Sequence, residues 1–130
     1  MNLDLTDDQR AILGALDSLC HPYETAPIHD APLAATSMGL ERELLDGGFL
    51  DVAFDPDLGA ITGAIVIERL ARMPHAVEAA ASLLVRPVLG VDVAHPLCLI
   101  EQRRPHRPVR FLRAGASVVE LGATVSLFTA

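Results

Sequence analysis

Apolar residues recur at helical spacing over most of the chain and give way to short β-type runs near its end. The run Thr6-Asp7-Asp8-Gln9 has the form of a capping box, in which the first and last side chains each bond a backbone N–H at a helix start. An apolar stripe at positions 12, 13, 16, 19 and 20 then predicts a helix. We expect this helix to end at Pro22, because a proline pushes the preceding residue out of the α region. A surface loop is expected from there to Thr36.

A second, short helix is predicted by apolar residues at positions 40, 44 and 45. Ser37 or Thr36 can cap its start, and Gly47-Gly48 is expected to end it, because glycine tolerates the left-handed conformation that closes helices. The apolar run Phe49–Phe54 that follows is expected to be extended.

Two more helices are expected before residue 95. The third runs from about Ala60 to Met73 and carries Glu68 and Arg72 four residues apart, which is typical of a solvated surface ion pair. The fourth opens after Pro74 and is rich in Ala, Val and Leu. Because it is apolar on most sides, it should be buried.

After Pro96 the pattern changes to short runs of β-branched and apolar residues between Gly and Pro. The expected extended segments are Leu97–Ile100, Val109–Leu112, Ser117–Leu121 and Ala123–Thr129. The sequence therefore predicts an α+β fold. A four-helix α-helical domain over residues 1–95 is followed by a short antiparallel β segment over residues 96–130.

Composition narrows the classes of function. The chain has 130 residues and a net charge of −7, which disfavours nucleic acid and anionic membrane surfaces as partners. Two distant cysteines do not make a disulfide framework, and no apolar run has the length of a membrane span. From these features we expect a soluble, cytoplasmic protein.

No complete catalytic motif is readable in the chain. None of the five histidines pairs with another at helical spacing, so a metal site is not expected. Glycine-rich phosphate loops and a nucleophile elbow are also missing. The cluster Glu101–Arg107 fits a solvated hairpin loop or, alternatively, a phosphate contact by Arg103, Arg104 or Arg107.

Several short motifs occur in an order that points to one family. The start Leu5–Arg10 is similar to Leu-Thr-Glu-Glu-Gln-Arg, and Pro56–Ala60 stands where a Pro-Glu-x-Tyr-Gly-Gly turn would be. Glu68–Arg72 matches a Glu-Glu-Leu-Gly/Ala-Arg helix end, and Leu40–Phe54 fits the helix and turn between these motifs. Together they resemble the N-terminal helical domain of the acyl-CoA dehydrogenases, followed by the start of the middle β domain.

The resemblance implies an FAD-dependent enzyme that oxidises an acyl-CoA thioester to a 2-enoyl-CoA, as in lipid or steroid catabolism. Family members bind the flavin between subunits, and the flavin performs the redox chemistry. By analogy, Ile100 and Glu101 are the candidates for flavin contact, and Ile65 and Leu84 are the candidates for the wall of the acyl pocket. No catalytic residue is assigned, because the family's glutamate base comes from a C-terminal region beyond Ala130.

The sequence departs from the family at the entry to the β domain. The family reads Ala-Leu-Thr-Glu-Pro-x-x-Gly-Ser-Asp there, whereas this chain has Cys98–Gln102, with Ile100 in place of a hydroxyl residue. The connection Val91–Pro96 is also shorter than usual. We therefore expect a chain that is inactive alone and does not retain FAD. It would be either part of an acyl-CoA dehydrogenase or a non-catalytic subunit or interaction module. The expected partner is another copy or another acyl-CoA dehydrogenase subunit.

Overall fold

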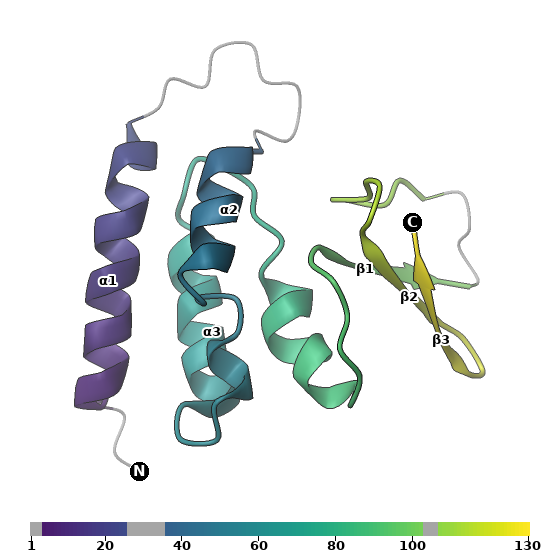
Figure 1. The fold of residues 1–130 in the computed structure, drawn as a ribbon, viewed down its shortest axis with the longest axis horizontal. Helices are drawn as coiled ribbons and strands as arrows, with labels where there is room; N and C mark the ends of the chain where they lie inside the picture. The colour runs from purple at the N-terminus through teal and green to yellow at the C-terminus, as the bar shows by residue number, and fades with distance from the viewer. Residues whose placement is uncertain (1–3, 26–35, 103–106) are drawn as a thin grey trace.

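The protein is described here by a computed structural model that covers residues 4–25, 36–102 and 107–130. The chain begins with three α-helices, and α1 (Asp7–Glu24) lies beside both α2 (Met38–Asp46) and α3 (Gly59–Leu70) (Figure 1). A short π-helix, η2 (Ala81–Val85), lies between them and a sheet of β1 (Leu97–Glu101), β2 (Ser117–Leu121) and β3 (Val125–Thr129). The α+β fold class is confirmed, with helices preceding strands along the chain.

Helix α1 begins at the predicted capping box. The Thr6 hydroxyl accepts from the Gln9 backbone N–H at 3.2 Å, and the Gln9 side chain accepts from the Thr6 N–H at 3.0 Å. The predicted end at Pro22 is wrong, because α1 continues to Glu24 with the proline inside its last turn. A proline near a helix end removes only one bond of the helical ladder, and the buried stripe that includes Leu16 and Cys20 holds the helix in place.

Helix α2 forms as predicted, with Ser37 as its cap and Gly48 past its end at a positive φ of 72°. The expectation that Phe49–Phe54 is extended is wrong. The chain turns after Gly48 and forms a 3₁₀ helix, η1 (Val52–Phe54). This turn lets Leu50 reach complete burial in the helical core, and tertiary packing therefore overrides the apolar run.

The fourth helix is much shorter than predicted. The chain after Pro74 does not become helical until Ala80, and η2 is followed by a 3₁₀ turn, η3 (Arg86–Val88). The reason is Glu78, whose carboxylate accepts from the backbone N–H groups of Ala81 and Ser82 at 2.9 and 3.2 Å. Glu78 therefore lies before η2 and caps its first turn, and it is not itself part of the helix.

The sheet has the order β1-β2-β3, and only its second pair is antiparallel. Strand β1 runs parallel to β2, with Leu97 opposite Ser117, so the prediction of a purely antiparallel segment is wrong. A parallel pair needs a long connection, which residues 102–116 supply. The expected extended run Val109–Leu112 lies in this connection and forms a turn, with Phe111 at a positive φ of 64°.

Two apolar clusters meet at η2. Ala79 and Leu83 pack into the helical core with α1, α2 and α3, whereas Ala81 packs with Leu97 and Val119 of the sheet. The element expected to be the last helix therefore touches both units, and the division at residue 95 stays a prediction. Over the described ranges, none of the helices combines the length and apolar character that crossing a bilayer requires.

Candidate functional site

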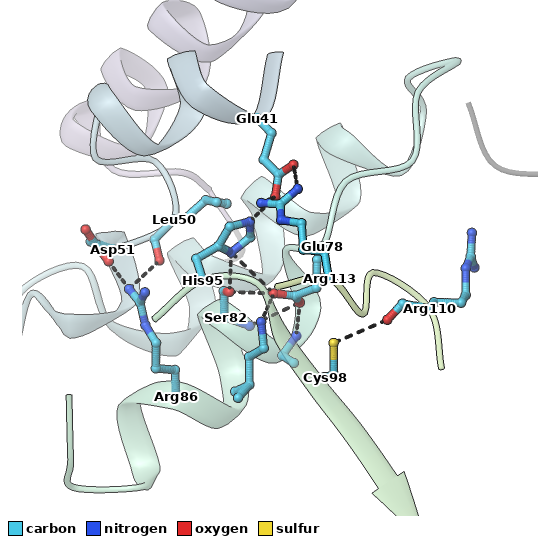
Figure 2. A network of polar contacts seen from close by, with 12 residues as sticks. Glu41, Leu50, Asp51, Glu78, Ser82, Arg86, His95, Cys98, Arg110 and Arg113 are labelled. Atoms are coloured by element: carbon cyan, nitrogen blue, oxygen red, sulfur yellow. Dashed lines mark hydrogen bonds and ion pairs between the residues drawn. The ribbon is translucent and has the colours of Figure 1, made fainter. Parts of the chain in front are cut away.

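A buried network of polar side chains lies where the helices meet the sheet (Figure 2). Its members come from distant parts of the chain: Glu41 from α2, Glu78 from the segment that precedes η2, Ser82 from η2, His95 from just before β1, and Arg113 from the turn before β2. The side chain of His95 is 2% exposed and that of Glu78 is 5% exposed. Burying polar groups this deeply costs free energy unless they are paired, so the contacts within the network stabilise the fold.

Glu78 connects η2 to the sheet. In addition to the two backbone N–H groups of η2, its Oε2 accepts from the Ser82 hydroxyl at 2.5 Å and from the Leu97 N–H at 3.1 Å. One carboxylate thus receives four donors, one of which belongs to β1.

Glu41 connects α2 to the same site. Its two oxygens accept from the Arg113 guanidinium at 2.7 and 2.8 Å in a bidentate pair, and Oε1 also lies 2.5 Å from His95 Nε2. Burial pushes the pKa of Glu41 upward, but the hydrogen bonds and charges of Arg113 and His95 outweigh it and hold this pKa below its ordinary value. Glu41 is therefore ionised at neutral pH.

Ser82, His95 and Glu41 follow one another at hydrogen-bond distance, as in a nucleophilic triad. Burial argues against that reading, because Ser82 is 0% exposed and its oxygen has no contact with solvent in this structure. The Ser82 hydroxyl is also shared between Glu78 and His95. We conclude that this series holds the two units of the fold together.

A second buried charge lies beside the network. Arg86 donates to Asp51 and to the Leu50 carbonyl (Figure 2). Its guanidinium also stacks 4.8 Å from the centre of the Phe54 ring. These contacts fasten the end of η2 to the turn after α2, which explains why the segment around η1 is not extended.

A cavity of about 520 Å³ opens beside β1, within the range of small-molecule sites. Its wall is largely apolar, with Leu99 and Ile100 from the strand and Val109 and Phe111 from the turn opposite. Two arginines, Arg107 and Arg110, also line it. Three glutamates, Glu78, Glu101 and Glu120, line it too, so the cavity wall carries charges of both signs and does not by itself select an anionic ligand.

The structure separates the residues predicted for a site. Ile100 and Glu101 both line the cavity beside β1, as does Arg107 of the basic cluster. Ile65 instead packs against the helical core, and Leu84 lies exposed on η2, so neither lines this cavity. Arg103 and Arg104 are outside the described residues.

Sequence reasoning missed the buried network. One signal was present, because Glu78 is a lone acid within the apolar run 76–85 and a buried carboxylate needs a partner. Its partners Glu41 and His95 are far away along the chain, and no local pattern points to them.

Within the described ranges no group of three or more His, Cys, Asp or Glu side chains is arranged to hold a metal ion. The comparisons with known proteins returned no match among protein-family models, curated proteins or solved structures.

Proposed function

We propose that this chain is an acyl-CoA dehydrogenase-like protein that does not catalyse alone and acts beside a flavin-bearing acyl-CoA dehydrogenase subunit. The order of the fold supports this proposal, since a helical unit precedes strands. The short motifs at Leu5–Arg10, Pro56–Ala60 and Glu68–Arg72 support it from the sequence.

The proposal that this chain does not catalyse alone rests on the identity of residue 100. Ile100 stands on β1 at the position that resembles the flavin-contacting hydroxyl of the family, and it lines the cavity beside that strand. A hydrocarbon side chain cannot donate a hydrogen bond to a flavin. The residue at position 100 therefore does not fit the flavin contact that the family makes there.

The partner part of the proposal is supported by the sheet. Val125, Leu127 and Phe128 of β3 are 62%, 45% and 51% exposed. Apolar side chains gathered on one strand are typical of surfaces that associate with another chain. We propose that the partner is a second copy or a related dehydrogenase subunit.

The deciding experiment is the visible absorption spectrum of the purified chain after incubation with FAD and desalting. The expected result is no retained flavin and no acyl-CoA turnover with an artificial electron acceptor. Turnover by the chain alone would contradict the proposal, and so would a stable oxidised-flavin spectrum.

A matched pair of variants locates any flavin that is retained. Ala80→Trp adds bulk at the wall of the cavity, whereas Ala64→Trp adds the same bulk on the exposed side of α3. Loss of flavin in the first variant alone would place it beside β1 and restore the case for a catalytic subunit.

A further inference from the structure

Three short contacts in the buried network are linked in series. Glu78 Oε2 lies 2.5 Å from Ser82 Oγ, Ser82 Oγ lies 2.8 Å from His95 Nδ1, and His95 Nε2 lies 2.5 Å from Glu41 Oε1. Each of these distances is that of a hydrogen bond, and a hydrogen bond has one hydrogen between its two heavy atoms. The series therefore needs three hydrogens.

The ordinary charge states supply only two. The Ser82 hydroxyl carries one hydrogen, a neutral imidazole carries one, and ionised carboxylates carry none. We infer that the series Glu78–Ser82–His95–Glu41 binds one additional proton and carries it on His95 as an imidazolium. His95 then donates from Nδ1 to Ser82 and from Nε2 to Glu41, and Ser82 donates onward to Glu78.

The charges around the site agree with this assignment. Glu41 faces it from α2, Glu78 from the segment that precedes η2, and Arg113 from the turn before β2. With the extra proton on His95, two acids balance two cations. Without it, one negative charge stays uncompensated, which is costly because Glu41, Glu78 and His95 are at most 10% exposed, although Arg113 is 37% exposed. Cys98 on β1 adds no charge near neutral pH, because burial raises the pKa of its thiol.

The proton acts on the joint between helices and sheet. Glu41 belongs to α2, whereas His95 immediately precedes β1, so their contact ties one unit to the other. The inference does not depend on the proposed function. The contact between the helices and the sheet is then a proton-binding site. It is stronger when His95 is protonated and weaker after the proton leaves.

The direction of the pH effect follows from linkage. A histidine in an unfolded chain releases its proton near pH 6.5, so above that pH the folded state holds more protons than the unfolded state. Stability then falls as pH rises, by up to about tenfold in the folding equilibrium constant per pH unit for one proton.

The direct test is ¹⁵N NMR of the histidine rings in the full chain from pH 6 to 8.5. Single substitutions of the other four histidines assign the His95 signals. We expect both ring nitrogens of His95 to stay protonated well above about pH 6.5, where an ordinary histidine loses its proton. A His95 that carries one ring proton at pH 7 would overturn the inference.

Unfolding in urea over the same pH range tests the consequence for the joint. We expect the wild type to lose stability with rising pH and His95→Gln to lose markedly less, whereas the exposed control His21→Gln should follow the wild type. Ser82→Ala removes the link between His95 and Glu78 but keeps the contact of His95 with Glu41, so it should flatten the profile less than His95→Gln. Parallel profiles for the wild type and both joint variants would refute a proton-dependent joint, and the NMR result decides if a variant does not fold.

Discussion

Removal of the Glu78 carboxylate is the sharpest perturbation that the structure offers. Glu78→Ala leaves three buried backbone N–H groups and the Ser82 hydroxyl without their acceptor. Each buried donor left unsatisfied costs about 1–3 kcal/mol, although water that enters the space can recover part of this. Breaking a buried charged network by removing one partner typically costs about 3–5 kcal/mol. We expect a loss in that range.

Such a loss is a large part of the stability of a domain, which is about 5–15 kcal/mol. The assay is urea unfolding followed by circular dichroism, with the free energy of unfolding taken from the midpoint and slope. Glu68→Ala is the matched control, because its pair with Arg72 is exposed and should contribute less than about 1 kcal/mol. Glu78→Gln keeps one acceptor oxygen but turns a donor toward Ser82 or Leu97, so it should fall between the two.

The reasoning fails if Glu78→Ala and Glu68→Ala unfold within about 1 kcal/mol of each other. That result would mean that the η2 N–H groups and β1 have other acceptors, and that Glu78 does not hold the joint. If Glu78→Ala is unfolded without denaturant, its loss of unfolding free energy lies at or above the upper end of the expected range. The free energy of unfolding of Glu78→Gln would then be compared with that of Glu68→Ala.

The other predictions concern acid stability, helix packing and association. Because the pKa of Glu41 is lowered, its contribution is present above about pH 4.3 and is lost as pH falls through the folded value, so Glu41→Gln should flatten the acid limb of a stability profile. Gly14→Ala should raise the free energy of unfolding by about 0.5–1 kcal/mol, since nothing lies within 4 Å of the added carbon in this exposed helical turn. Gly63→Ala should lower it, because the added carbon would meet Ala53 at 3.1 Å. In chemical denaturation, a destabilised Gly14→Ala would contradict the first statement and a stabilised Gly63→Ala the second. The chain should self-associate in light scattering and Leu127→Asp should reduce the apparent mass, whereas a wild type that stays monomeric at high concentration would oppose an association surface on β3.

Local rules predicted the elements whose cause lies within a few residues. The capping box at Thr6, the Ser37 cap and the glycine stop after α2 were read from neighbouring side chains, and the structure has all three. The α+β class followed from the change of apolar period near Pro96 for the same reason. Ile100 and Glu101 were named by resemblance and lie together at the cavity only because they are adjacent on one strand.

The sequence by itself determined the centres of α1, α2, α3 and the three strands, and the acidic, apolar character of the chain. The tertiary structure alone decided the direction of β1, the late start of η2 and the site at the joint. Each of these depends on partners distant in sequence, since Glu78 meets Leu97 and Glu41 meets His95. A buried charge has a large free-energy cost unless a partner reaches it, so these contacts overrode the helical pattern after Pro74. The apolar periodicity of the sequence does not indicate which distant residue pairs with Glu78 or with Glu41.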